Sequence, residues 1–130
     1  MDKGKNLKAV CFGEVLWDVF PSHKKIGGAP LNVALRMNSL GIATTIISRI
    51  GKDEDGDNLW SFLKEQNVSS DSIQVGEDYK TGVVNVMINE KGNASYDILY
   101  PSSWDKITLT KEMIEKVSES DVFIDRKSVV

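Results

Sequence analysis

The first half of the chain alternates between apolar runs and helical patterns. Residues 8–16 form a mostly apolar run, typical of a strand buried on both faces of a sheet. Pro30 fits the first position of a helix that Gly41 ends. Residues 42–50 are rich in β-branched side chains and predict a strand, and a helical pattern follows them to about residue 66. Strand, helix, strand, helix is the order of an α/β sheet.

The pattern becomes rich in strand signals after Val68. Residues 82–89 and 94–100 predict a β hairpin around the turn at 90–93. The other elements that the pattern predicts are a strand or extended loop at 17–26, a short strand at 72–76, a helix over 111–118 capped by Thr110, and a core strand at 121–124. We therefore expect an α/β body interrupted by a β-rich insertion. Because no helix follows the last strand, residues 1–130 are expected to be the first part of one larger domain.

Composition excludes several classes of protein. The 130 residues are 41% hydrophobic and 27% charged, as in ordinary globular domains. A net charge of -3 argues against nucleic acid as the partner. The apolar run near the N-terminus is too short for a membrane span. Cys11 is the single cysteine and lies in an apolar run, which favours a buried thiol and a cytoplasmic location, and with His23 as the single histidine it leaves no zinc set.

Asp18 is the first candidate for chemistry. It follows the carboxyl end of the first predicted strand, the edge where open α/β sheets bind their ligands. A carboxylate there can accept hydrogen bonds from neighbouring hydroxyl groups of a ligand. The alternative is a loop aspartate in a turn before Pro21.

A glycine pair precedes the first predicted helix. Gly27 and Gly28 would allow a ligand to approach the backbone, and Asn32 offers a donor and an acceptor one turn later. The segment matches neither the dinucleotide motif GxGxxG nor a P-loop. The alternative is a plain strand-to-helix turn.

The acidic run at residues 53–57 suggests calcium, but the spacing fails. An EF-hand loop would need aspartate in place of Gly51 and glutamate in place of Phe62. A loop in which Asp55 or Asp57 caps the next helix explains the acids better. No metal site is therefore expected.

Together these features resemble the PfkB (ribokinase-like) family of carbohydrate kinases. The family signature is similar to the stretch from Gly27 to Ala34, with glycines at the later offsets 41 and 51. Residues 51–56 resemble the family motif G-x-D-x-x-G. Within the family, GGAPLNVA and residues 101–105 look most like bacterial fructokinases, and the resemblance extends to about residue 124.

The resemblance implies a fold and a site. The fold would be a ribokinase-like three-layer sandwich, here incomplete, with an inserted small β lid formed by residues of about 17–26 and 72–100. Asp18 and Asn32 would hold sugar hydroxyls above the backbone of Gly27 and Gly28. Aromatic side chains of the lid, which either cover the ligand or simply pack in the hairpin, are Phe20, Tyr96, Tyr100 and, just beyond it, Trp104. The family phosphorylates a sugar hydroxyl with ATP and Mg²⁺, and its lid often makes a homodimer contact.

One departure from the family pattern limits the expected activity. The catalytic aspartate of the family lies in a C-terminal Gly-Ala-Gly-Asp motif, which this sequence lacks. We therefore expect no catalytic residue, no strong binding of ATP or Mg²⁺ and no kinase activity in this chain alone, which resembles a truncated sugar-binding half. Fructose is the expected sugar, with 2-keto-3-deoxygluconate or ribose as alternatives. A non-catalytic sugar-binding or dimerisation module is the competing hypothesis.

Overall fold

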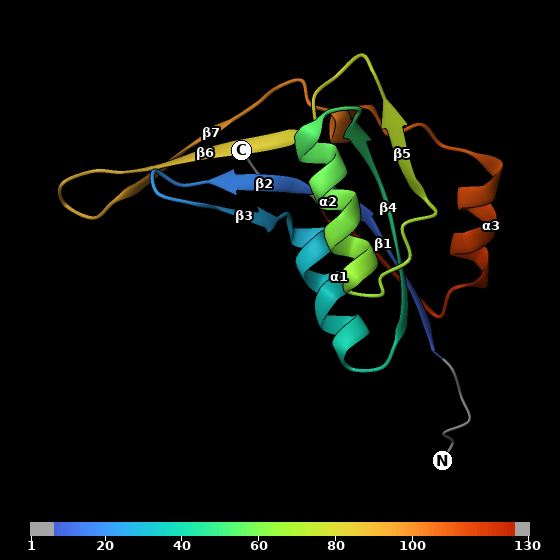
Figure 1. Ribbon diagram of the computed structural model, residues 1–130. Helices are drawn as coiled ribbons and strands as arrows, with labels where there is room; N and C mark the ends of the chain where they lie inside the picture. The colour runs from blue at the N-terminus through green and yellow to red at the C-terminus, as the bar shows by residue number, and fades with distance from the viewer. Residues whose placement is uncertain (1–6, 127–130) are drawn as a thin grey trace.

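The computed structural model describes residues 7–126. Residues 1–6 and 127–130 lie outside this range. Within it, the strands form two four-stranded sheets of order β5-β4-β1-β8 and β3-β2-β6-β7, and the second sheet projects away from the first (Figure 1).

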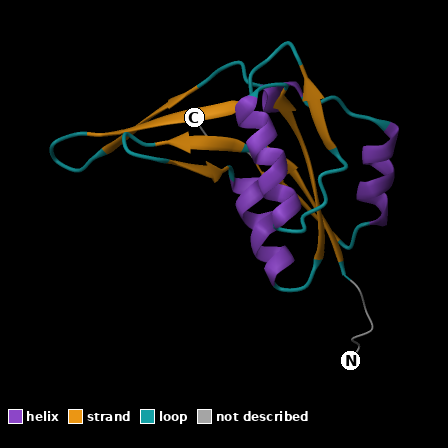
Figure 2. Cartoon of the chain, in the orientation of Figure 1, coloured by secondary structure: helices purple, strands orange, loops and turns teal. Residues whose placement is uncertain are grey.

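The first sheet is the centre of a three-layer body. Its strands are all parallel: β1 (Lys8–Gly13), β4 (Ala43–Gly51), β5 (Ile73–Gly76) and β8 (Val122–Arg126). Helices α1 (Ala29–Ser39) and α2 (Glu54–Glu65) lie on one face, and α3 (Lys111–Glu119) lies on the other (Figure 2). Cys11 and Ile46 point into the core under α1 and α2, whereas Val10 and Ile47 pack with Met113 of α3. The expected α/β sandwich with a parallel sheet is confirmed.

The second sheet, which we call the small sheet, is built from two separate parts of the chain. Its strands are β2 (Leu16–Val19), β3 (Lys24–Gly27), β6 (Gly82–Ile88) and β7 (Ala94–Ile98). The pairs β2–β3 and β6–β7 are antiparallel hairpins, and β2 pairs parallel to β6. The predicted hairpin around residues 90–93 and the expected insertion are therefore present.

Two expected boundaries are wrong. Residues 8–16 are not one strand, because the chain leaves the body at Gly13, where φ is 141°, and continues from Leu16 in the small sheet. The expected lid segment from residue 72 begins too early, because β5 pairs with β4 in the body and the chain joins the small sheet only at Gly82. Both errors have one cause: neighbouring strands of similar composition belong to different sheets.

The ends of the helices follow the sequence signals with one correction. Gly41 has a φ of 86° just after α1, and Thr110 accepts a hydrogen bond from the amide of Met113 at the start of α3. The cap of α2 is Asp53, whose Oδ1 accepts from Gly56 N at 2.8 Å, and not Asp55 or Asp57, which lie inside the helix. A short 3-10 helix, Ser103–Lys106, was not expected. Within residues 7–126 no helix combines the length and apolar content that a bilayer crossing requires.

Candidate functional site

The candidate residues gather where the small sheet meets the carboxyl ends of β1 and β4. Asp18 lies in β2, in register with Lys25 of β3 and with Val84 of β6. Because side chains alternate along a strand, Asp18 shares a face of the small sheet with Leu16 and Val84. These two apolar side chains are buried, so the carboxylate stands at the border of a hydrophobic cluster.

The Asp18 carboxylate has no hydrogen-bond or ion-pair partner among the described residues. Its Oδ2 atom occupies the space that a side chain at Gly27 would fill. Burial raises the pKa of Asp18 above its ordinary value of 3.8. A partly buried carboxylate without a partner is a strong acceptor for a ligand hydroxyl, because that bond would replace lost hydration.

Gly28 allows the start of α1 to lie close to the chain that follows β1. It is the N-terminal cap of α1 with a φ of 109°, and a Cβ atom there would lie 2.6 Å from the carbonyl oxygen of buried Glu14. No side chain caps the helix. Asn32 is exposed one turn later, and its amide donates to the oxygen of Gly28 at 2.9 Å. The structure therefore brings Asp18, Gly27 and Gly28 together and places Asn32 beside them on α1.

The aromatic candidates occupy different environments. Phe20 is half-buried against the apolar cluster of the small sheet and stacks on His23, with ring centroids 4.7 Å apart. Tyr96 is in register with Val86 and thus on the Asp18 face, but 66% of its surface is exposed. Tyr100 follows β7 and is 77% exposed. Trp104 is half-buried and packs against Gly82. Phe20 is therefore the candidate most firmly fixed near Asp18.

Cys11 is a structural thiol. Its side chain is fully buried under α1, and burial raises the pKa of the thiol from 9.0 to about 11. A thiol with this pKa stays protonated at neutral pH. Among residues 7–126 no group of three or more His, Cys, Asp or Glu side chains could hold a metal ion.

Two contacts that tie the small sheet to α2 were missed by the sequence reasoning. Thr81 hydrogen-bonds to Asp53, and Lys24 forms an ion pair with Asp55 at 2.9 Å. Burial alone would raise the pKa of Asp53, but hydrogen bonds from Thr81 and Gly56 and the charge of Lys80 lower it below the ordinary value. The motif at residues 51–56 was the available sequence signal for the Thr81–Asp53 contact. No local sequence pattern indicates the Lys24–Asp55 ion pair.

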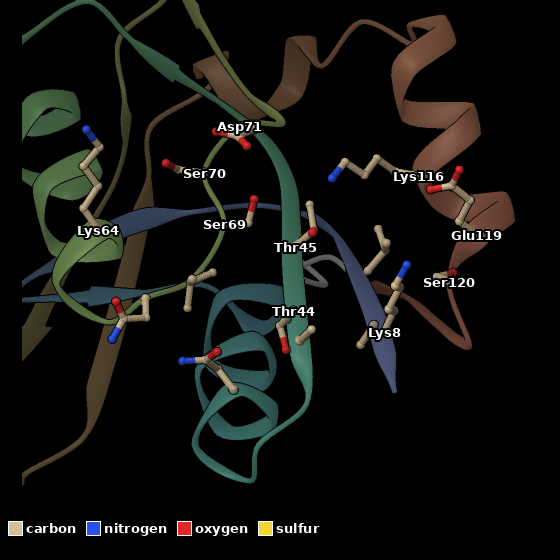
Figure 3. Close-up of a pocket in the computed structure, with 16 residues that line it drawn as sticks. Lys8, Thr44, Thr45, Lys64, Ser69, Ser70, Asp71, Lys116, Glu119 and Ser120 are labelled. Carbon is tan, nitrogen blue, oxygen red and sulfur yellow. The ribbon is translucent and has the colours of Figure 1, made fainter. Parts of the chain in front are cut away.

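A cavity of about 580 Å³ lies at the opposite end of the body (Figure 3). It opens where β1 and β4 begin, beside the last turns of α2 and α3. Its labelled polar side chains come from several elements: Lys8, Thr44, Thr45, Lys64, Ser69, Ser70, Asp71, Lys116, Glu119 and Ser120. Because α/β sheets bind ligands at the carboxyl ends of their strands, this cavity is separate from the candidate site.

Comparison with known proteins gives one consistent result. A model described as "pfkB family carbohydrate kinase" matches residues 5–123. The relative named "Probable fructokinase-6, chloroplastic" from Arabidopsis thaliana is 28% identical over 127 residues, which cover 88% of this chain and 33% of the relative. The chain thus spans about a third of the length of the first curated relatives that it matches.

Solved structures agree with the sequence matches. The fructokinase of Halothermothrix orenii aligns with a TM-score of 0.79 at 25% identity and covers 92% of this chain and 46% of that chain. An "uncharacterized sugar kinase PH1459 from Pyrococcus horikoshii in complex with ATP" aligns with a TM-score of 0.77 at 26% identity, over 92% of this chain and 42% of that chain. The arrangement of the body and the small sheet is therefore shared with these kinases.

Proposed function

Because this chain belongs to the pfkB family of carbohydrate kinases, we propose that it forms the sugar-binding part of an enzyme that phosphorylates a sugar hydroxyl with ATP. The environment of the Asp18 carboxylate is the observation that supports this proposal most directly. Its carboxylate is partly buried, has no partner among the described residues and lies against Gly27 at the ligand-binding edge of the body. A sugar supplies neighbouring hydroxyl groups, which are the donors that such a carboxylate lacks.

Fructose is the sugar we propose, with 2-keto-3-deoxygluconate and ribose as alternatives. Support for fructose comes from the relatives and structural neighbours that carry the name fructokinase. Asn32 would bind a further hydroxyl, and the backbone at Gly28 would line the floor of the site. The small sheet, with Phe20, Tyr96 and Tyr100, would act as a lid that excludes water, since transfer of the phosphoryl group to water competes with the reaction.

We propose that this chain does not bind the phosphates of ATP or Mg²⁺ strongly by itself. Residues 7–126 contain no cluster of three or more potential metal ligands, and the sequence has no Gly-Ala-Gly-Asp. We propose that ATP and Mg²⁺ bind to the part of the enzyme that the relatives possess beyond the matched span, and that these 130 residues alone do not turn over ATP.

A homodimer through the lid is the proposed assembly. Strand β7 lies at the edge of the small sheet, and the exposed side chains near it include Met87, Ile88 and Tyr96. An open strand edge with exposed apolar side chains favours pairing with a second copy. We place the enzyme in the cytoplasm, in keeping with the unpaired Cys11, although the relative from Arabidopsis is named chloroplastic.

The test measures binding and turnover separately. Isothermal titration of the 130-residue chain with fructose, ribose and 2-keto-3-deoxygluconate should detect one sugar, and Asp18→Asn should weaken that binding about tenfold or more, because a charge-assisted hydrogen bond is lost. A coupled assay should show no sugar-dependent ATP turnover. Turnover by the pure chain would refute the proposed division of labour.

One competing function is a sugar-binding or dimerisation module without catalysis. Reading the source gene beyond codon 130 in all three frames separates the two. A continuation that encodes Gly-Ala-Gly-Asp supports the kinase, and a stop codon with no such sequence in any frame supports the module.

A further inference from the structure

The small sheet is attached to the body at the first turn of α2 by two different sets of contacts. The first set is partly buried. Thr81, directly before β6, is 1% exposed and hydrogen-bonds to both carboxylate oxygens of Asp53, at 2.7 and 3.0 Å. This set fixes the second chain segment of the small sheet where it leaves the body.

The second set is exposed and holds the first chain segment. Lys24 of β3 forms an ion pair with Asp55 at 2.9 Å, with the two side chains 43% and 36% exposed. The same ammonium group lies 4.6 Å from the centre of the Trp17 ring. The indole Nε1 of Trp17 donates to the carbonyl oxygen of Asp55 at 2.9 Å. Asp55 therefore contacts both strands of the β2–β3 hairpin, through two different atoms.

We propose that Asp55 is a positioning residue for Asp18. Trp17 and Asp18 are neighbours in β2, so their side chains point to opposite faces of the small sheet. Contacts of Trp17 and Lys24 with Asp55 fix one face of the hairpin to α2. The position of the strand is then set, and with it the position of the Asp18 carboxylate on the other face. The consequence for sugar affinity rests on the function proposed above, whereas the positioning of the strand does not.

The two attachments respond differently to conditions. The partly buried hydrogen bonds between Asp53 and Thr81 are screened less by salt than the exposed Lys24–Asp55 pair is. The order of the β2–β3 hairpin is therefore more sensitive to ionic strength than the start of β6 is. An ion pair of this exposure contributes little to overall stability, so its removal is expected to loosen the hairpin without unfolding the chain.

Hydrogen exchange of the 130-residue chain tests the positioning directly. Asp55→Asn removes the ion pair, and Asp57→Asn is the matched control, because Asp57 is an exposed acid in the same helical turn. Amides of residues 16–27 should exchange about two- to fivefold faster in Asp55→Asn than in Asp57→Asn, with β4 unchanged in both. High salt should produce the same acceleration in the wild-type chain but not in Asp55→Asn. Equal exchange in the two variants would overturn the proposal.

Further variants separate positioning from a general loss of structure. Trp17→Phe removes the indole donor while it keeps an aromatic ring under Lys24, and it should also accelerate exchange in residues 16–27. Asp55→Glu should restore slow exchange because it keeps the charge. Sugar affinity should fall about two- to fivefold in Asp55→Asn, recover in Asp55→Glu and stay unchanged in Asp57→Asn. If the wild-type chain binds no sugar, the proposed function fails, and the exchange comparison still decides whether Asp55 holds β2.

Discussion

Thr81 and Asp53 lie 28 positions apart, and two groups of Thr81 donate hydrogen bonds to the two carboxylate oxygens of Asp53. The Thr81 hydroxyl donates to Oδ1 of Asp53 at 2.7 Å, and the Thr81 amide donates to Oδ2 at 3.0 Å. The same hydroxyl accepts from the amide of Gly51 at 2.9 Å. The end of β4, the start of α2 and the start of β6 thus meet at one side chain.

The first prediction concerns this side chain. Thr81→Val keeps the shape of the residue but removes the hydroxyl. Asp53 Oδ1 then loses one of its hydrogen-bond donors, and the buried amide of Gly51 loses its acceptor. We expect the free energy of unfolding to fall by about 2–3 kcal/mol, measured in urea. Thr81→Ser keeps the hydroxyl and should lose clearly less. A loss in Thr81→Ser as large as or larger than that in Thr81→Val would contradict the prediction, because it would show that the methyl group contributes at least as much as the hydroxyl.

The second prediction concerns the backbone at the start of α1. Gly28→Ala places a Cβ atom 2.6 Å from the carbonyl oxygen of Glu14 at a φ of 109°. Gly41→Ala is the matched control, because its φ is 86° and nothing lies within 4 Å of the added Cβ atom. Thermal unfolding should show a loss of about 1 kcal/mol for Gly41→Ala and a markedly larger loss for Gly28→Ala. Equal losses of stability in the two variants would show that the added Cβ atom at position 28 does not collide with the carbonyl oxygen of Glu14.

The third prediction compares two fully buried serines. Ser48 Oγ has no hydrogen-bond partner within the described part of the chain, whereas Ser103 Oγ donates to the carbonyl oxygen of Arg49 at 3.0 Å. Ser48→Ala should leave the free energy of unfolding unchanged or raise it by up to about 1 kcal/mol, because an unsatisfied hydroxyl is removed. Ser103→Ala should lower it by about 1 kcal/mol. Urea unfolding of both variants decides, and a large loss in Ser48→Ala would mean that its hydroxyl is satisfied in solution.

The fourth prediction concerns the pH dependence of stability at Asp18. Its folded-state pKa is raised above 3.8 by burial, so the folded chain binds this proton more tightly than the unfolded chain does. The ionised carboxylate therefore costs stability at neutral pH, and this cost disappears as the pH falls through the folded pKa towards 3.8. Asp18→Asn should be more stable than the wild type at pH 7, with a difference that shrinks on acidification.

The control for the Asp18 experiment is Asp97→Asn. Asp97 is an exposed acid of β7 in the same small sheet, so it matches the charge change without the burial. Unfolding at pH 7 and pH 4.5 should give no stabilisation in this variant. A wild type more stable than Asp18→Asn at pH 7 would contradict the assigned cost of burial.

The body could be predicted from sequence because its signals are local. Pro30, Gly41 and Thr110 stand at helix ends, and each has the role that its chemistry favours. The division between two sheets could not be predicted from residues 8–16, because the apolar run is equally compatible with one long strand and with two. The backbone conformation of Gly13 decides, and a glycine in the sequence does not reveal its φ.

The candidate site was predictable as a set of residues but not as a geometry. Asp18, Gly27 and Gly28 were selected from short motifs, and the structure places them together. The contacts of Asp55 with Trp17 and Lys24 join segments 38 and 31 positions apart, and no spacing rule connects such segments. Asp53, which caps α2, likewise has a distant partner, Thr81.

The parallel pairing of β2 with β6 also has a consequence for biosynthesis. Leu16 is paired with Gly82, and α1, β4, α2 and β5 all lie between them in the chain. Pairing across such a separation must overcome a large loop-closure entropy. Asp18 therefore leaves the ribosome early, whereas β6, the strand that pairs with β2, leaves it much later. During translation the β2–β3 hairpin has no β6 beside it until α1, β4, α2 and β5 have been made, so the Asp18 carboxylate is synthesised long before the strand that supports it.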